Sequence, residues 1–361
     1  MMRLGDVWDS FLDEGIFEQA SKNACRSRRD KTEVGAYLDK KDELLPRLME
    51  QVRHHNVPRH RYRMFEVHEK GKTRDVADLP LYPFRILHWA IALAIEDKLN
   101  RKLIDQTHAS RPKHGIHSAI IDLRNYLDND SRIRYALQID VKKFFPSMDK
   151  EMVKNKLRTV LKDKDMLMLL DQIIDEYPYP GIAIGNRVSP MFANLVLSEI
   201  DHKMKEQHNV HYYVRYMDDI VILGYSKPWL HHILRIMEKE LGEIGLTIKG
   251  NYQIYPIDSR GIQFVGYRLY TTHTLVRKNI KKNLKGKTTE IWKRIEKGQP
   301  LTKHDRGTIA SYQGVLKWCD GKHLYKTTIG RIEDQVQKNE QEWYTCRTYR
   351  QFIKNNKEIF S

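Results

Sequence analysis

The sequence predicts an α+β protein whose central antiparallel sheet is backed by helices. One observation is a hairpin: His211–Arg215 is aromatic and β-branched, Ile220–Leu223 is apolar, and Tyr216-Met217-Asp218-Asp219 links them. A second observation is that apolar residues recur at helical spacing on both sides of this hairpin. The middle of the chain therefore reads strand, helices, hairpin, helix, strand.

The first third of the chain is mainly helical and charged. A basic turn near Gly71–Arg74 separates two short extended pieces. Pro83–Asn100 follows, with apolar residues at the spacing of a helix. We therefore expect a helical N-terminal region interrupted by one small hairpin.

The central region begins with a predicted strand at Ile133–Val141, and Asp149 opens the next helix as its N-cap. Ser189 reads as another N-cap, with Pro190 at the first helical position. Apolar residues then recur every four positions and give that helix one buried face: Phe192, Val196, Ile200 and Met204.

After the hairpin, an amphipathic helix starting near Trp229 ends at Gly245. Leu246–Ile248 is expected to start a strand, and Gln263–Tyr270 reads as a further short β-unit. The remaining chain is basic and predicted to be helical.

Composition indicates a folded protein with a polyanionic partner. The 361 residues are 40% hydrophobic, with a formal net charge of +16. Residues 275–361 hold 20 Lys and Arg against 9 Asp and Glu, a net of +11. This excess favours nucleic acid over a merely soluble basic surface.

Cysteine and histidine usage argues against several other classes. The three cysteines have no CxxC spacing, which suggests a reducing compartment without structural zinc or disulfides. The histidine pairs lack partners for a zinc set and read better as surface or loop residues. Since we see neither a signal peptide nor a spanning segment, we expect a cytoplasmic protein with no membrane contact.

The acidic residues Asp140, Asp218 and Asp219 suggest catalysis. Asp218-Asp219 is either an ordinary hairpin turn or a cation site, and Asp140 is either a surface residue at a strand end or a metal ligand. Taken together, Asp140 and Asp218 become candidates for a two-metal site, with cations about 4 Å apart. Such a site could activate a 3′-hydroxyl and stabilise a leaving pyrophosphate, and Mg²⁺ suits its hard oxygen ligands.

Several motifs carry a family resemblance. Seven stretches occur in the order of reverse transcriptase motifs, and the match covers roughly residues 60–330. These stretches are Lys72–Arg74 with Phe84-Arg85, Arg111–His117, Asp140–Ser147, Gly185–Pro190, Tyr216–Asp219, Phe264–Tyr267 and Ser311–Trp318. The chain resembles a prokaryotic reverse transcriptase, similar to those of diversity-generating retroelements and of phage-defence systems, including the Abi-like and unknown-group enzymes.

The resemblance implies a right-hand polymerase with fingers, palm and helical thumb. On this basis residues 1–132 form an N-terminal extension and fingers, 133–272 the palm with part of the fingers, and 273–361 a basic helical thumb. Asp140 and Asp218 would coordinate two Mg²⁺ ions (or Mn²⁺) together with Val141, and Asp219 would support them.

Further residues are assigned to the incoming nucleotide by the same resemblance. Phe145 matches the steric gate that favours deoxynucleotides, although it could equally be a core aromatic beside Phe144. Lys72 and Arg74 would contact phosphates or else lie at a solvated hairpin tip, and Arg111 has the same two interpretations. Lys249 could act as general acid for pyrophosphate.

The loop before the Ser-Pro motif departs from the family pattern. The nucleotide-binding loop would include Ile184, Gly185 and Ser189, but many reverse transcriptases carry Gln where this chain has Ile184. Diversity-generating enzymes show a similar substitution, which goes with error-prone synthesis. They usually have Gln where this chain has Pro190, and this favours the defence group slightly.

Nucleic acid would be held by the primer grip and thumb. The residues assigned to it are Phe264, Gly266, Tyr267, Lys281, Lys282, Lys285, Tyr312 and Lys317. The run of lysines could alternatively be a solvated helix face.

These features predict an RNA-directed DNA polymerase that uses deoxynucleoside triphosphates to copy a structured non-coding RNA into DNA. The expected role is antiviral defence, with error-prone retroelement synthesis as the alternative. An RNA-binding scaffold or an RNA-directed RNA polymerase are rival interpretations, disfavoured by the intact acids and by Phe145. A second protein or a homo-oligomer is a further expected partner.

Overall fold

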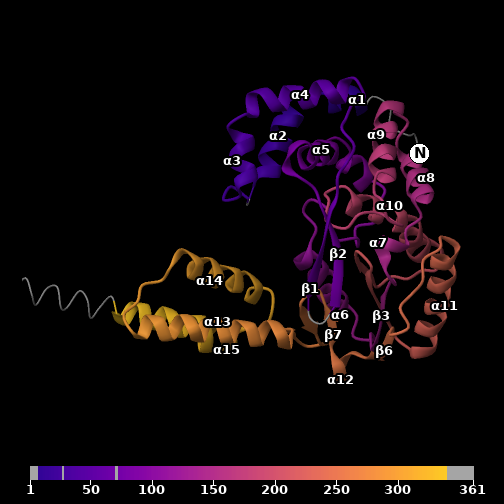
Figure 1. Ribbon diagram of the computed structural model, residues 1–361. Coiled ribbons are helices and arrows are strands. Elements are labelled where there is room, and N and C mark those ends of the chain that lie inside the picture. Colours follow the sequence, from indigo (N-terminus) through magenta and orange to yellow (C-terminus); the bar gives the residue numbers. More distant parts are fainter. Residues whose placement is uncertain (1–6, 27, 70–71, 340–361) are drawn as a thin grey trace, which may run out of the picture. The chain divides into compact units, whose positions relative to one another are not determined.

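The computed structural model describes residues 7–339 apart from 27, 70 and 71, and omits the side chains of Glu69, Lys72 and Arg74. Cys346 therefore lies outside the described residues. The chain divides into two compact units (Figure 1). The first comprises residues 1–126 and 130–255, and the second comprises 127–129 and 256–361.

A four-stranded sheet forms the centre of the first unit. Its strand order is β4-β5-β3-β6, from β3 (Tyr135–Asp140), β4 (Tyr213–Tyr216), β5 (Asp219–Gly224) and β6 (Gln253–Pro256). Strand β5 pairs antiparallel with both β3 and β4. Its apolar run is buried because the strand is central to the sheet.

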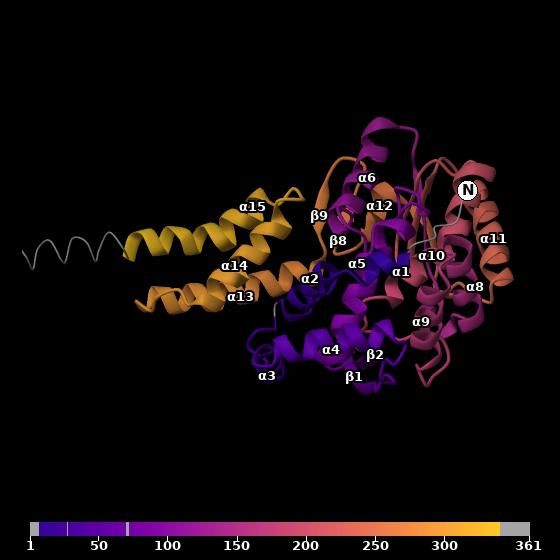
Figure 2. The same ribbon diagram turned by 90° about the horizontal axis from the view of Figure 1, so that it is seen from above.

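Two regions of helices complete the first unit. The N-terminal helices are α1 (Val7–Phe11), α2 (Glu14–Cys25), α3 (Thr32–Leu38), α4 (Lys41–Arg53), α5 (Ile86–Asn100) and α6 (Ile116–Asn129). The helices between and after the strands are α7 (Phe144–Ser147), α8 (Lys150–Val160), α9 (Lys164–Asp175), α10 (Ser189–His202) and α11 (Lys227–Glu243). A separate antiparallel hairpin joins β1 (Arg63–Glu69) to β2 (Lys72–Asp78). Helix α2 packs along α5 in both views (Figures 1 and 2).

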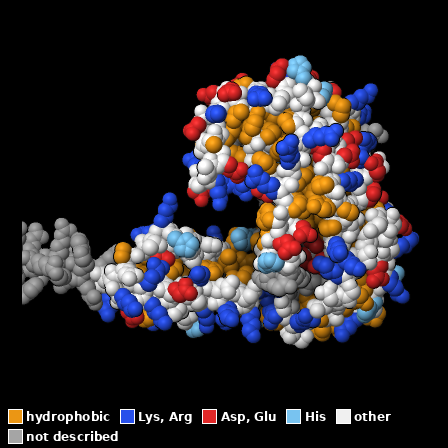
Figure 3. All heavy atoms as spheres, viewed as in Figure 1, with side chains coloured by type: hydrophobic (Ala, Val, Ile, Leu, Met, Phe, Trp, Pro, Cys, Tyr) orange, Lys and Arg blue, Asp and Glu red, His pale blue; other side chains and the backbone are white. Residues whose placement is uncertain are grey.

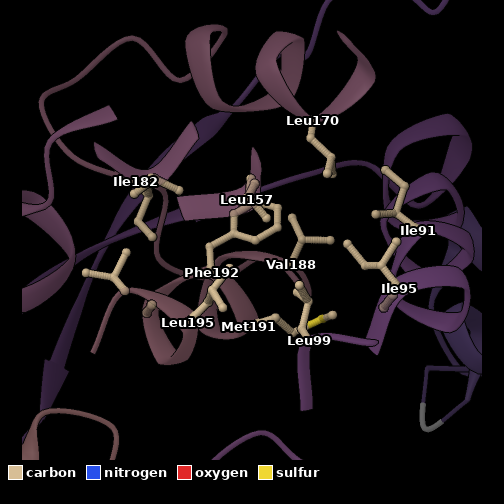
Figure 4. Packing of buried hydrophobic residues seen from close by; sticks show 14 of the residues in the cluster. Ile91, Ile95, Leu99, Leu157, Leu170, Ile182, Val188, Met191, Phe192 and Leu195 are labelled. Atoms are coloured by element: carbon tan, nitrogen blue, oxygen red, sulfur yellow. The ribbon is translucent and has the colours of Figure 1, made fainter. Parts of the chain in front are cut away.

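The hydrophobic core lies where α5 and α10 meet. Helix α5 is apolar nearly all round, which suits a helix enclosed by others. Figure 4 shows Ile91, Ile95 and Leu99 of α5 facing Met191 and Phe192 of α10. Because this core holds α10 rigidly, the loop that precedes it is fixed in place as well.

The second unit has a small sheet and a helical arm. Its sheet order is β7-β8-β9, from β7 (Ile262–Phe264), β8 (Tyr267–Leu269) and β9 (Thr274–Val276), preceded by α12 (Ile257–Arg260). Helices α13 (Lys278–Glu296), α14 (Lys303–Leu316) and α15 (Lys322–Tyr325) follow. Ile291, Ile295 and Ile332 form the core of this arm.

Most predicted elements are present, and the mixed helix and sheet architecture is confirmed. Asp149 caps α8, its side chain accepting a hydrogen bond from the Met152 N–H at 2.8 Å. The predicted strand at Leu246–Ile248 is wrong, because Ile248 makes only an isolated bridge to Val141. The actual fourth strand is β6, which sequence analysis missed. No helix of the described chain is both long and apolar enough to cross a bilayer.

Candidate active site

The acidic hairpin lies at one end of the central sheet. Tyr216 pairs with Asp219 across β4 and β5, so Met217 and Asp218 form the turn, with Met217 at a φ of 57°. On the other side of β5, Asp140 is opposite Asp219 in the register of β3. Asp140, which is distant in sequence, therefore lies at the same end of the sheet as the adjacent pair Asp218 and Asp219.

Asp140 and Asp218 interact directly. Burial raises the pKa of Asp218 to about 6, and the charge of Asp140 and a hydrogen bond to its carboxyl raise this pKa as well. The Nζ of Lys249 donates to the Asp140 carboxylate, and the Lys249 N–H donates to the Asp140 carbonyl at 2.8 Å. Lys249 thus supplies one positive charge for two acids.

Asp219 has a different set of neighbours. The Gln138 amide donates to its Oδ1 at 3.5 Å, and the Tyr255 hydroxyl donates to Gln138 at 3.1 Å. Asp219 is thus connected to the interior of the sheet, whereas Asp140 keeps 40% of its side chain exposed.

The donor set of Asp140 and Asp218 fits a hard divalent cation. Two carboxylates in mutual contact with a single lysine are under-neutralised, and Mg²⁺ prefers one or two carboxylates plus substrate phosphates. Among the described residues no group of three or more His, Cys, Asp or Glu side chains gathers into a metal cluster.

Arg215 supports the hairpin from beneath, and sequence analysis did not identify it. Its side chain is fully buried and donates from Nε and Nη2 to the Asp201 carboxylate, which is also buried. From Nη1 it donates to the Asn194 side-chain oxygen at 3.0 Å and to the Met217 carbonyl at 3.1 Å. The guanidinium therefore joins α10 to the turn that carries Asp218.

A second group of contacts completes this buried network. The Thr107 hydroxyl donates to Asp201 at 3.1 Å, and the Tyr213 hydroxyl donates to it at 2.7 Å. The segment around Thr107 also bridges to β4 through the backbone of Arg215. A charged residue inside the aromatic and β-branched pattern of a predicted strand was the available signal, because such a charge needs a partner when it is buried.

Phe145 lies on α7, which follows the end of strand β3. Its ring is half-buried and meets Phe144 edge-on at 5.5 Å. The Phe145 carbonyl accepts from the Ile182 N–H at 3.1 Å. Gly181 has a φ of 82°, and a Cβ there would lie 2.2 Å from this carbonyl. Only glycine allows the two segments to approach this closely.

The loop after Gly181 then reaches the β1–β2 hairpin. The Ile184 carbonyl accepts from the Ala77 N–H at 2.7 Å, and Gly185 has a φ of 112°, where a Cβ would lie 2.8 Å from the Ala77 carbonyl. The prediction of Ser189 as N-cap is wrong. Ser189 is already helical, and the Asn186 side chain accepts from its N–H at 2.8 Å.

The remaining residues predicted to bind the nucleotide are Lys72, Arg74 and Arg111. Lys72 and Arg74 belong to strand β2 and not to a turn, and their side chains lie outside those described. Arg111 donates to the carbonyls of Ile104 and Thr107, each at 2.7 Å. Burial lowers its pKa, which fits a residue that organises its own loop.

Residues of the second unit fall into two groups. Phe264 and Tyr267 are buried, and the Tyr267 hydroxyl donates to the Val315 carbonyl at 3.0 Å, so their side chains belong to the core. Gly266, at a φ of 98°, forms the turn between them. The exposed lysines of the set are Lys281, Lys282, Lys285 and Lys317, whereas Tyr312 is half-buried. Figure 3 shows Lys and Arg side chains along this unit. Contact with nucleic acid stays a prediction for all of them.

Comparisons with known proteins agree with this geometry. Residues 59–269 match the family described as reverse transcriptase (RNA-dependent DNA polymerase). The Retron Ec73 reverse transcriptase of Escherichia coli is 27% identical over 247 residues, covering 62% of this chain and 75% of the retron enzyme. The COX1/OXI3 intron 1 protein of Saccharomyces cerevisiae is 21% identical over 268 residues, covering 56% of this chain but only 32% of that protein.

A solved structure shares the fold. Telomerase from Candida albicans, in complex with a TWJ fragment of telomeric RNA, superposes with a TM-score of 0.50 at 11% identity. The match covers 83% of this chain and 60% of the telomerase chain. The expected enzyme class, an RNA-directed DNA polymerase, is confirmed at the level of the family. The matched residues hold Asp140, Asp218 and Asp219 and all four strands of the central sheet, so the chain belongs to the reverse transcriptase (RNA-dependent DNA polymerase) family.

Proposed function

We propose that the protein copies a structured non-coding RNA into DNA by two-metal nucleotidyl transfer. The observation that carries the proposal is the contact between the Asp140 and Asp218 carboxyls at the strand ends. Asp140, Asp218 and the main chain at Val141 would hold Mg²⁺, with Asp219 in a supporting role. When bound, the metal would supply Lewis-acid activation of the attacking hydroxyl and stabilise the leaving pyrophosphate.

The protein's own residues have distinct parts in this proposal. Asp140 and Asp218 present oxygens on a rigid sheet edge, and Arg215 fixes the turn by holding the Met217 carbonyl. Lys249 is paired with Asp140, so it is placed to neutralise charge at the site and to give a proton to pyrophosphate.

Phe145 would exclude a ribose 2′-hydroxyl and so select deoxynucleoside triphosphates. Phe144 packs edge-on against its half-buried ring, and Gly181 lies close to its main-chain carbonyl. Lys72 and Arg74 would meet the triphosphate, while the exposed lysines of α13 would follow the nucleic acid backbone.

The biological role that we propose is antiviral defence, supported by Pro190 and by the likeness to a retron enzyme. Error-prone synthesis for a diversity-generating retroelement is the second candidate, favoured by Ile184. Measuring phage plaque formation on cells that carry the whole locus tests the role. Equal plaquing with wild type and with Asp218→Ala would refute a defence role that depends on synthesis.

One assay tests the activity itself. The purified protein, with its co-purifying RNA, is incubated with deoxynucleotides or with ribonucleotides and Mg²⁺, beside Asp218→Ala and the conservative Asp218→Asn. Synthesis of DNA that both variants abolish is the expected result. Ribonucleotide incorporation would indicate an RNA polymerase, and RNA retention without synthesis would indicate a scaffold.

A further inference from the structure

A polar cavity of about 280 Å³ lies between the N-terminal helices and the loop that leads into α10. This is smaller than most pockets for drug-sized ligands, which span roughly 300–1,000 Å³, so it has room for one small chemical unit. Its lining includes four arginines, a buried histidine and an amide: Arg26, Arg28, Arg85, Arg187, His88 and Asn186.

The arginines give the cavity an excess of hydrogen-bond donors. No carboxylate belongs to its described lining, but Arg28 pairs with Glu33 at 3.5 Å and Arg85 pairs with Asp78. Arg187 pairs with Glu96 at 2.6 Å through Nη2, yet its Nε is buried without a partner among the described residues. Arg26 is exposed and makes no ion pair within the described chain. Because each guanidinium has five N–H donors, much of this capacity remains for an anion.

His88 adds a group of opposite hydrogen-bonding character. The Glu176 carboxylate accepts two hydrogen bonds from His60, one from its backbone N–H at 2.9 Å and one from its ring Nδ1–H at 2.5 Å. The proton of the neutral His60 ring is therefore on Nδ1. The His60 Nε2 is therefore a bare acceptor, and the His88 Nε2, 3.1 Å away, must donate to it. This fixes the proton of neutral His88 on Nε2 and leaves its Nδ1 as an acceptor.

The His88 Nδ1 has no partner within the described structure, although the side chain is only 1% exposed. Burial lowers the pKa of His88, which keeps the ring neutral and the acceptor available. A ligand that satisfies the whole cavity must carry an anion beside a hydroxyl donor. An acidic peptide side chain offers the anion alone, whereas a ribose 2′-hydroxyl lies next to a phosphate in every RNA nucleotide.

We propose that this cavity binds one ribonucleotide, with the phosphate held by the arginines and the 2′-hydroxyl donating to His88. The preferred source is an RNA strand, and a free ribonucleotide has the same chemistry. The inference deepens the proposed function, on which it rests for the choice of RNA. It adds a site that distinguishes RNA from DNA and lies outside the pair of acids.

Equilibrium binding tests this without any synthesis. The full-length protein is titrated into a short labelled single-stranded RNA and into DNA of the same sequence, over a range of salt concentrations. Arg26→Gln should weaken binding of both strands about three- to tenfold and reduce the salt slope by about 0.7. Arg101→Gln is the matched control, because Arg101 is also an exposed arginine at a helix C-cap, that of α5.

His88→Gln tests the ribose contact, since a glutamine amide can replace the Nε2 donor toward His60 but not the Nδ1 acceptor. The wild type should prefer RNA by roughly tenfold, the value of one buried hydrogen bond, and the variant should lose most of this preference. Should the variant fail to fold, 2′-O-methyl RNA with the wild-type protein measures the same contact, and weaker binding is expected.

The outcomes separate the possible sources. Competition by adenosine monophosphate, but not by deoxyadenosine monophosphate, would assign the cavity to a free ribonucleotide, and competition by RNA alone would assign it to a strand. The proposal is overturned if Arg26→Gln behaves like Arg101→Gln, or if both His88→Gln and 2′-O-methyl RNA leave the preference unchanged. Asp218→Ala should bind RNA normally, so a failure of the proposed synthesis is recognised separately.

Discussion

At the scale of single residues, the turn that carries Asp218 is held by one buried side chain, that of Arg215. Arg215 was absent from the sequence-based set, because a sequence shows a charge in a strand but not which partner lies behind it. Asp140, Asp218 and Asp219 were identified correctly as neighbours, since their motif order places them at the ends of adjacent strands. Their metal-binding roles remain predictions.

We expect Arg215→Lys to lower the single-turnover rate of synthesis by about ten- to a hundredfold, because lysine cannot reach Asp201, Asn194 and Met217 together. Lysine keeps the charge but leaves some of the buried acceptors without a donor, at a cost of roughly 1–3 kcal/mol each, so the variant should also unfold at lower temperature. Arg158→Lys is the control, since its pairing with Asp171 is partly exposed and contributes about 1 kcal/mol or less. Wild-type rates in Arg215→Lys would show that the turn needs no such support.

A second residue-scale prediction concerns Lys249. Its ammonium competes with a cation for the Asp140 carboxylate. Lys249→Gln should therefore lower the Mg²⁺ concentration that gives half-maximal synthesis, while the rate at saturating Mg²⁺ falls if Lys249 gives a proton to pyrophosphate. A metal titration of the two proteins measures both effects, with Lys239→Gln on the exposed face of α11 as control. A higher Mg²⁺ requirement would contradict this interpretation of the pair.

At the scale of elements, the loop from Gly181 to Val188 connects the predicted steric gate to the β1–β2 hairpin. Sequence periodicity located the flanking helices but could not reveal this connection, because it depends on two glycines whose conformations only the folded backbone shows. The predicted cap at Ser189 was wrong for another reason: the side chain that accepts from the Ser189 N–H is that of Asn186, three residues earlier.

Gly181→Ala should destabilise the protein by more than about 2 kcal/mol, since the added Cβ would overlap the Phe145 carbonyl at a left-handed backbone. Gly35→Ala, in helix α3 with no atom near the new Cβ, should instead stabilise by about 0.5–1 kcal/mol. Chemical denaturation of both variants measures the difference, and similar midpoints would show that the loop yields easily.

Ile184→Gln tests the departure from the family pattern. The Ile184 backbone bonds to Ala77 regardless of its side chain, so the loop should keep its shape. Misincorporation should change more than the rate of polymerisation, because an amide could then hydrogen-bond near the templating base pair. Sequencing the products made on a defined template measures the error spectrum. Identical spectra in the two enzymes would exclude Ile184 as a determinant of fidelity.

At the scale of the whole molecule, composition predicted a nucleic-acid partner, and the mixed helix and sheet class is confirmed. The division into fingers, palm and thumb remains a prediction. The structure separates two units between Tyr255 and Pro256, upstream of the basic region expected to begin at residue 273. Charge alone could not locate this boundary, because β7, β8 and β9 precede the basic helices in the same unit.

Stability of the whole molecule should depend on pH through His60 and His88. Burial lowers the pKa of both rings in the folded state, so below their ordinary value of about 6.5 the unfolded chain takes up protons that the folded chain refuses. The free energy of unfolding should therefore fall by as much as about 1.4 kcal/mol per pH unit for each histidine between about pH 6.5 and 5.5. Thermal denaturation across this range checks the slope, and His88→Gln should flatten it. A free energy of unfolding that stays constant down to about pH 5.5 would contradict the claim that burial keeps His60 and His88 neutral.

The contact between Arg215 and the carbonyl of Met217 also bears on inhibition. Because Arg215 links the turn that carries Asp218 to α10, a compound that displaces α10 from within the protein should distort this turn without occupying a nucleotide-binding surface. Resistance to such a compound could not arise by altering nucleotide contacts, and would have to come from rebuilding the protein's interior.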